Sequence, residues 1–224
     1  MASRAIELRI ALAAFAALAA LFVALPQIDL AVSARFFADD GWLYARHTAL
    51  LEPLYRGVPR LGQGLLLLLT LGLLLGAFRH FAWLRARRTT LGFLLAAALL
   101  GPVLVVDAGL KDHMGRARPL TVAEFGGARQ FTAAFVPSEQ CDKNCSFVSG
   151  HVATASFLMA FGWLGAPAVR RRWLAAGLAG GALLAFVRLS AGGHFLSDCV
   201  FAWFATYFSL WATEWAFRKL KWLP

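Results

Sequence analysis

Residues 91–110 read LGFLLAAALLGPVLVVDAGL, a run of twenty positions with a single charged side chain, Asp107. A run of this length and polarity crosses the hydrocarbon layer of a bilayer as a helix. The same character extends through the chain: 60% of its 224 residues are hydrophobic, and the mean hydropathy is +0.65. We therefore predict an all-α, polytopic integral membrane protein.

Five further apolar runs resemble the first. They cover residues 10–28, 61–78, 148–164, 174–189 and 199–217. Most hold the roughly 17 to 25 residues of a transmembrane helix, and 174–189 is the shortest. One such run could be a buried helix of a soluble protein, but six favour six spans. Because no repeat or linker divides the chain, residues 1–224 are predicted to form one membrane-embedded domain.

Basic residues predict the orientation of the spans. They form four clusters: Arg4 and Arg9; Arg79, Arg85, Arg87 and Arg88; Arg170, Arg171 and Arg172; and Arg218, Lys219 and Lys221. Six spans place all four clusters on one side, which the positive-inside rule makes cytoplasmic. The net charge of +10 then reflects topology and the site described next, and a nucleic-acid partner is not favoured.

Three short strings carry most of the remaining polar chemistry: KDHMGRARP at 111–119, SGH at 149–151 and RLSAGGHFLSD at 188–198. Each falls at a span end that faces away from the basic clusters. Their residues include three cations, two histidines and one carboxylate that could act together, namely Lys111, Arg118, Arg188, His151, His194 and Asp198. This set suits phosphate transfer through a covalent intermediate without a metal.

The spacing within the strings suggests a chemical role for each group. The cations would neutralise phosphate oxygens, one histidine would attack phosphorus and the other would protonate the leaving oxygen. His194 and Asp198 are four residues apart, so on a helix the carboxylate would accept the second imidazole N–H. Ser149 and Gly150 begin a predicted helix, whose free N–H groups favour an anion.

Simpler explanations apply to single residues. Lys111 and Arg188 could extend toward lipid headgroups without binding a substrate. His47 and His80 are predicted to be ordinary surface histidines. Asp107 lies one turn before Lys111 and is predicted to pair with a basic residue of the site rather than to transfer a proton.

The strings read lysine, six residues, Arg-Pro; then Ser-Gly-His; then arginine, five residues, histidine, three residues, aspartate. This pattern resembles the type 2 phosphatidic acid phosphatase (PAP2) superfamily, which shares its site with vanadium haloperoxidases. The resemblance implies a six-helix membrane phosphatase with its site at the outer membrane surface, a phosphohistidine intermediate and no metal. It assigns phosphate binding to Lys111, Arg118, Ser149, Gly150 and Arg188, acid catalysis to His151, nucleophilic attack to His194 and orientation of that histidine to Asp198.

Two positions depart from the usual motifs of that superfamily. Val148 stands where proline is common and Val187 where serine is common. Neither replaced residue carries charge, so the chemistry is expected to survive. The strings NCSFVSGH and GGHFLSD are similar to bacterial phosphatases that act on lipid A. The sequence thus predicts a lipid phosphatase of the bacterial inner membrane, with its active site facing the periplasm and a lipid A phosphate as favoured substrate.

Three alternatives stay open at this point. Undecaprenyl diphosphate is a rival substrate, and the same residues could pass phosphate to a second lipid instead of water. A lipid transporter that has kept a phosphate site is the non-enzymatic alternative, although it would be expected to line its midplane with polar residues. The sequence does not predict the oligomeric state.

Two polar segments lie between the spans. Residues 29–60 are predicted to form short helices along the outer interface, broken at Pro53 and Pro59. Residues 112–147 are predicted to cover the site without a long helix.

Cys141 and Cys145 lie in the second of these segments. They are predicted to form either a small disulfide or two free thiols, with zinc binding less favoured. The N-terminal apolar run is predicted to be the first span, with a signal peptide cleaved after Ala34 as the alternative.

Overall fold

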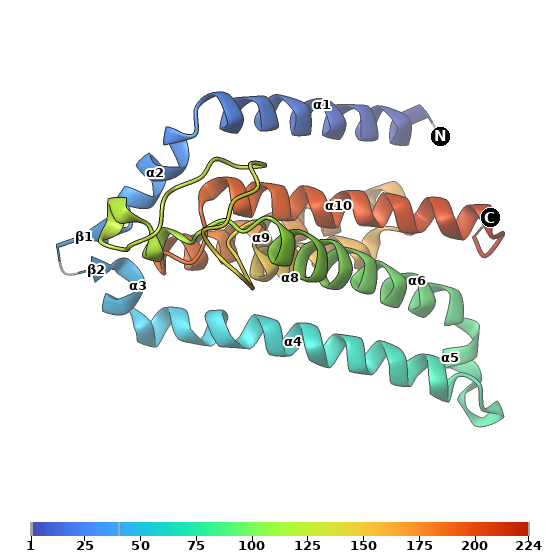
Figure 1. The fold of residues 1–224 in the computed structure, drawn as a ribbon. Coiled ribbons are helices and arrows are strands. Elements are labelled where there is room, and N and C mark those ends of the chain that lie inside the picture. Colours follow the sequence, from blue (N-terminus) through green and yellow to red (C-terminus); the bar gives the residue numbers. More distant parts are fainter. Residues whose placement is uncertain (1, 40, 224) are drawn as a thin grey trace.

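A computed structural model describes residues 2–39 and 41–223 as a bundle of long helices (Figure 1). The main helices are α1 (Ala2–Ala24), α2 (Gln27–Ala34), α4 (Thr48–Leu75), α6 (Arg88–Ala98), α8 (Gly150–Ser156), α9 (Pro167–Ser190) and α10 (Leu196–Lys219). Helix α6 continues into the π-helical segment η2 (Leu99–Leu110) and α7 (Lys111–His113), and α8 into the 3₁₀ segment η5 (Phe157–Gly162). The short elements are β1 (Phe37–Ala38), β2 (Gly41–Trp42), α3 (Leu43–Arg46), η1 (Arg79–Phe81), α5 (Ala82–Ala86), η3 (Pro119–Thr121) and η4 (Ala123–Phe125).

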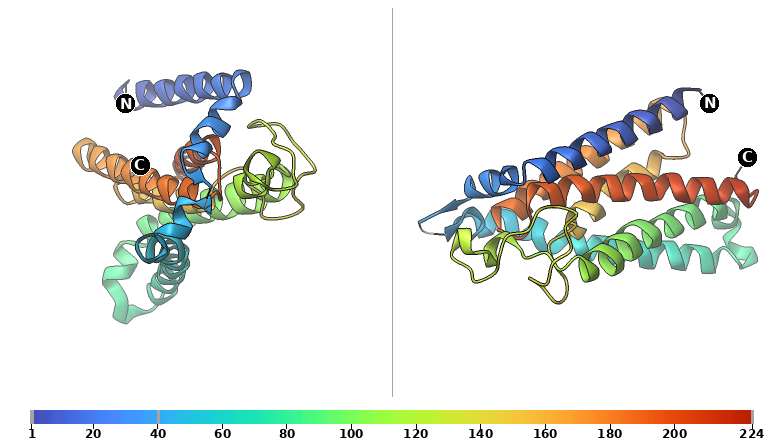
Figure 2. Two further views of the ribbon diagram at one scale, coloured as in Figure 1. Left: turned by 90° about the vertical axis from the view of Figure 1, so that its left-hand side faces the viewer. Right: turned by 45° about the horizontal axis from the view of Figure 1, so that its top comes forward.

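Helix α10 forms the centre of the bundle. It contacts α6, η2, α8 and α9, and its buried side chains extend from Ser197 to Phe217. A helix buried on several faces belongs to the core. Helices α1 and α4 lie on opposite outer sides of the bundle (Figure 2). The prediction of an all-α fold is therefore confirmed, apart from the two-residue strands of one small hairpin.

Four helical stretches in the described part of the chain are long and apolar enough to cross a membrane. They are Arg4–Ala24, Thr48–Leu75, Arg88–His113 and Pro167–Ser190. The predicted count of six is not confirmed. The predicted span 148–164 forms only α8 and η5, which together rise about 22 Å, less than the about 30 Å of a hydrocarbon layer. The predicted span 199–217 lies within α10, where Glu214 and several hydroxyl side chains interrupt the apolar residues.

Prolines explain most of the differences in helix boundaries. The predicted break at Pro53 and Pro59 is wrong, because α4 continues through both prolines to Leu75. A proline inside a helix removes one backbone hydrogen bond but does not always end the helix. The predicted span 10–28 is interrupted, since α1 ends at Ala24 and α2 follows Pro26. Helix α9 starts with Pro167, a residue well suited to a first turn.

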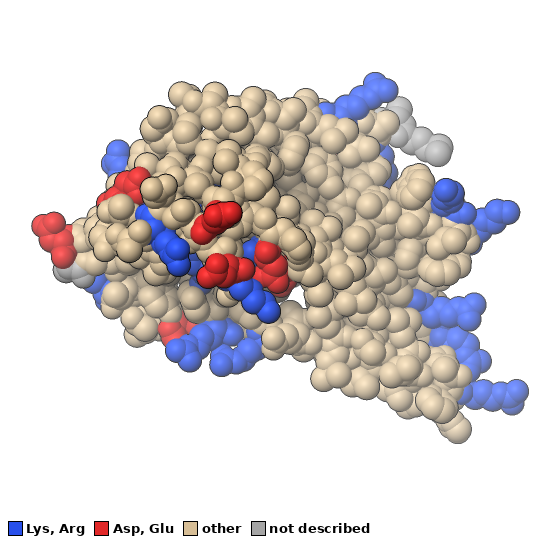
Figure 3. Space-filling model, viewed as in Figure 1, with Lys and Arg blue, Asp and Glu red and all other residues tan. Residues whose placement is uncertain are grey.

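Charged side chains pair at one end of the bundle. Arg4 and Arg218 both pair with Glu214, and Arg170 pairs with Glu7 at 2.6 Å. Both chain ends and α5 lie at this same end (Figure 1), and in Figure 3 many lysine and arginine side chains gather there. The basic clusters therefore share one end of the fold, as the sequence predicted.

We expect single cysteines at the two ends to react differently with an impermeant thiol reagent. In a background with serine at Cys141, Cys145 and Cys199, Arg87→Cys should stay protected in intact spheroplasts and Ala128→Cys should be labelled, because the positive-inside rule places position 87 in the cytoplasm. Both positions are exposed in the structure, so both should react after lysis. Labelling of position 87 but not of position 128 before lysis would show that the orientation is opposite to the predicted one.

Candidate active site

The three strings meet at the end of the bundle opposite the paired charges. Lys111 begins α7, Ser149 precedes α8, Arg188 lies in the last turn of α9 and Asp198 lies in the first turn of α10. The Ser149 N–H donates to the Asp198 carbonyl at 3.1 Å, and the Cys145 N–H donates to the Lys111 carbonyl at 3.1 Å. The fold thus joins residues that are far apart in the sequence.

The three predicted phosphate-binding cations are close to one another. Lys111 Nζ and Arg118 Nη2 both donate to Asn144 Oδ1, at 3.2 and 3.1 Å. Burial and the neighbouring Arg188 lower the pKa of Arg118. The Arg188 side chain is buried, and its Nε and Nη1 atoms have no hydrogen-bond partner within the described chain. A buried guanidinium with unused donors is suited to binding an anion.

His194 lies just before α10 instead of on it, so its spacing from Asp198 does not place both residues on one helix face. Its Nδ1–H donates to the Ser146 carbonyl at 2.7 Å, whereas Asp198 Oδ2 lies 3.7 Å from the same nitrogen. The predicted hydrogen bond from imidazole to carboxylate is thus replaced by one to the backbone. Either hydrogen bond selects the same tautomer of His194, because Nδ1 keeps the proton and the lone pair stays on Nε2.

The surroundings of His194 keep its imidazole neutral. Burial lowers the pKa of His194, and the nearby Arg188, Arg118 and Lys111 lower it further. The Nε2 atom is buried and has no hydrogen-bond partner among the described residues. An unprotonated, unpartnered nitrogen beside three cations is placed to attack an anionic phosphate ester.

Asp198 belongs to a buried network that sequence reasoning missed. Its Oδ2 accepts hydrogen bonds from the Ser146 hydroxyl at 2.5 Å and the Phe195 N–H at 2.7 Å. Its Oδ1 accepts from Arg116 Nη1 at 2.6 Å, and Arg116 Nη2 donates to Asp29 at 2.8 Å. Asp29 and Arg116 are both buried. The network fixes α2, the loop after α7 and the start of α10 to one another.

His151 faces α4 as well as the cations. Its Nε2–H donates to the Tyr55 carbonyl at 2.9 Å, and the two rings lie 5.2 Å apart. The Arg188 guanidinium lies 4.5 Å from the centre of the Tyr55 ring. Sequence reasoning placed Tyr55 only within the interfacial segment 29–60, because nothing in the sequence indicates which residue of a long helix meets a distant histidine.

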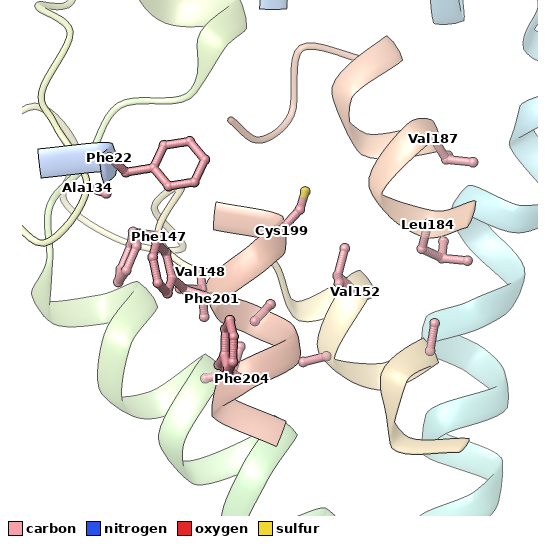
Figure 4. Close-up of a cluster of buried hydrophobic side chains, with 14 residues drawn as sticks. Phe22, Ala134, Phe147, Val148, Val152, Leu184, Val187, Cys199, Phe201 and Phe204 are labelled. Carbon is pink, nitrogen blue, oxygen red and sulfur yellow. The ribbon is translucent and has the colours of Figure 1, made fainter. Parts of the chain in front are cut away.

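Figure 4 shows a cluster of buried hydrophobic side chains, several of which are sequence neighbours of the site residues. Val148, Val152, Val187 and Cys199 each stand next to a residue of the site, and all four belong to one hydrophobic cluster. Val148 and Val187 are the two departures from the usual motifs. Both are fully buried, so these departures change the core and leave the polar groups of the site as they are.

Gly193 explains part of the GGH string. A side chain at this position would begin 2.5 Å from Arg188 Nη2, too close for any Cβ atom. Glycine therefore lets the backbone pass directly over the guanidinium and brings His194 beside it.

The segment that covers the site contains only the short η3 and η4 helices between α7 and α8, as predicted. Cys141 and Cys145 are joined by a disulfide, which settles the alternative that the sequence left open. Asn144 lies inside this small loop and contacts Lys111 and Arg118. The disulfide thus constrains the segment that touches two of the cations.

Comparison with known proteins identifies the family of the chain. The model of the PAP2 superfamily matches residues 88–222. Proteins named lipid A 4′-phosphatase are similar to the chain: that of Francisella tularensis subsp. novicida (strain U112) is 44% identical over 126 residues, covering 55% of this chain and 56% of that protein. That of Rhizobium leguminosarum is 42% identical over 130 residues, covering 57% and 55%. The matched region thus spans little more than half the length of either relative. No solved structure matches the chain significantly.

Proposed function

The chain belongs to the PAP2 superfamily, and from this premise we propose that it hydrolyses a phosphate monoester of a membrane lipid, with the 4′-phosphate of lipid A as substrate. The main structural support is the set of unpartnered nitrogens in the site. His194 Nε2 and two Arg188 nitrogens are buried without a hydrogen-bond partner in the described chain. A bound phosphate would satisfy these groups together.

The first chemical step forms a phosphohistidine. His194 Nε2 attacks phosphorus, and the bond from phosphorus to the lipid oxygen breaks while His151 gives that oxygen a proton. Lys111, Arg118 and Arg188 stabilise the charge that develops on the other phosphate oxygens. The N–H of Gly150 is assigned to the same anion from the first turn of α8, whereas the Ser149 N–H already donates to the Asp198 carbonyl.

The second step releases phosphate. His151 takes a proton from a water molecule, whose oxygen attacks phosphorus, and the bond from phosphorus to His194 breaks. The imidazolium that exists between the two steps lies near Asp198, whose Oδ2 is 3.7 Å from Nδ1. Asp198 therefore acts chiefly through its charge, while the Ser146 carbonyl holds the ring in place.

An apolar cavity supports a lipid as the substrate. It has a volume of about 530 Å³ and lies between α4, η2, α8, η5 and α9. Its lining is almost wholly apolar, but it includes Asp107, which pairs with Lys111 at 3.2 Å as predicted. The cavity therefore reaches one of the phosphate-binding cations. A lipid phosphate matches both parts in polarity, because its phosphate suits the cations and its acyl chain suits the apolar cavity.

Filling the cavity should weaken the binding of long chains. Val103 lines it, and the next residue, Leu104, is exposed and does not. We expect Val103→Trp to raise KM for a long-chain lipid phosphate about tenfold, the effect of excluding about two methylene groups. Hydrolysis of an aryl phosphate should stay unchanged in this variant. Leu104→Trp is the matched control, and an equal rise in KM for both variants would contradict the assignment.

The decisive experiment compares substrates with purified protein. Lipid A, undecaprenyl diphosphate and phosphatidic acid are incubated separately, and phosphate release and lipid masses are followed with and without EDTA. We expect lipid A to lose its 4′-phosphate to water and the rate to withstand chelation, because guanidinium and ammonium groups bind the phosphate. Faster hydrolysis of undecaprenyl diphosphate, or phosphate recovered on a second lipid, would replace the proposed reaction. Phosphate release from none of the three would reject it.

The location follows from the same proposal. The basic end of the bundle faces the cytoplasm of a bacterium and the site faces the periplasm, where the phosphate of a lipid in the outer leaflet of the inner membrane can reach it.

A further inference from the structure

Pro59 changes the hydrogen bonding of α4 beside the active site. In an α-helix the carbonyl of Tyr55 accepts a hydrogen bond from the N–H four residues later. That position is Pro59, which lies inside α4 and has no N–H. The Tyr55 carbonyl is therefore available to another donor, although it lies within a continuous helix.

His151 is that donor. Its Nε2–H reaches the Tyr55 carbonyl at 2.9 Å, and its ring lies 5.2 Å from the Tyr55 ring at an angle of 45°. A carbonyl oxygen can only accept a hydrogen bond, so Nε2 must carry a proton whether the imidazole is neutral or charged. The proton that His151 gains and loses is then the one on Nδ1.

We propose that Pro59 and Tyr55 are positioning residues of the active site, which fix His151 so that Nδ1 is the atom that exchanges a proton with the substrate. In the substrate complex the imidazolium form of His151 gives its Nδ1 proton to the leaving lipid oxygen in the first step, and the neutral form accepts one from water at Nδ1 in the second. Nε2 remains protonated throughout. This inference rests on the proposed role of His151 as the acid.

The position of these residues adds to the argument. Tyr55 and Pro59 precede residues 88–222, the region that the family model matches. The Tyr55 ring also lies under the Arg188 guanidinium, at 4.5 Å. One turn of α4 thus contacts the acid through its backbone and a phosphate-binding cation through its ring. Helix α4 forms part of the site although it lies outside the matched region.

Pro59→Ala tests the role of the freed carbonyl. Alanine restores an N–H that can bond to Tyr55 within the helix, so His151 must share its acceptor. We expect kcat on a lipid phosphate to fall about tenfold, the upper range for one hydrogen bond. Because Pro59 also lines the apolar cavity, the effect on the acid is measured in kcat and not in KM for the lipid. An aryl phosphate, which needs no acid, should be hydrolysed within about twofold of the wild-type rate. Pro53→Ala, in the same helix, is the matched control and should retain wild-type kcat on both substrates.

The tautomer of His151 gives a second, independent measurement. In wild-type protein with isotope-labelled histidine, NMR should show neutral His151 with its proton on Nε2, assigned with the help of His151→Gln. Pro59→Ala should shift the population toward the other tautomer. Because no substrate is needed, this measurement decides the inference even if the proposed hydrolysis fails.

Two results would overturn the inference. A wild-type His151 that carries its proton on Nδ1 when neutral excludes the bond to Tyr55, and this needs no folded Pro59 variant. A Pro59→Ala protein with wild-type kcat on the lipid phosphate and an unchanged tautomer would show that the proline has no role in positioning the acid.

Discussion

His194→Ala should abolish the turnover of every phosphate ester, with a loss of about 10⁶-fold in kcat, as is typical when a covalent nucleophile is removed. The same change should abolish the acid-labile phosphoenzyme seen after rapid quenching. The reason is geometric: Nε2 is the unpartnered nitrogen beside Arg188, and its lone pair is fixed by the bond from Nδ1–H to Ser146. Activity on lipid and aryl phosphates should be lost equally, since attack on phosphorus precedes any difference between leaving groups.

A matched control separates loss of chemistry from loss of fold. His80 is exposed, so His80→Ala should retain full activity, and the thermal unfolding of both variants should resemble that of the wild type. Measurable phosphoenzyme in the His194→Ala protein would show that another residue is the nucleophile.

The pH dependence of the wild type follows from the lowered pKa of His194. An ordinary histidine has a pKa of about 6.5 and would lose most of its neutral form near pH 6. Burial and three cations lower the pKa of His194, so its neutral form persists as the pH falls through that range. We expect kcat/KM for an aryl phosphate to show no loss attributable to His194 between about pH 8 and pH 6. A loss of kcat/KM for the aryl phosphate with an apparent pKa near 6.5 would contradict a lowered pKa of His194.

Sequence patterns located the site because its residues stand at helix ends and in fixed local spacings. Lys111, Arg188 and Asp198 could be placed at one end of the bundle from the order of the apolar runs alone. The partners of these residues could not be found in that way. Asp29 and Arg116 are 87 residues apart, and no local pattern indicates that the two form a buried ion pair.

The hydrogen-bond partners of His151 and His194 could not be predicted from the sequence either. A spacing of four residues predicts a shared helix face only when both residues are helical, and His194 precedes α10. The prolines of α4 were expected to break it, because propensity describes an isolated helix and leaves out tertiary packing. In the folded protein α4 packs against α6, α8 and α9, and the carbonyl that Pro59 frees is used by His151.

The second large effect is expected at His151, and it should depend on the leaving group. A sugar or alkyl oxygen is a poor leaving group and needs a proton, whereas an aryl oxide departs without one. His151→Ala should therefore lose about 100-fold to 10,000-fold in kcat on a lipid phosphate, the usual contribution of general acid catalysis, and far less on an aryl phosphate. Steady-state rates of one preparation on both substrates measure this ratio, with His194→Ala as the reference that loses both equally. Equal losses on the two substrates would mean that His151 binds phosphate and that the proton comes from another group.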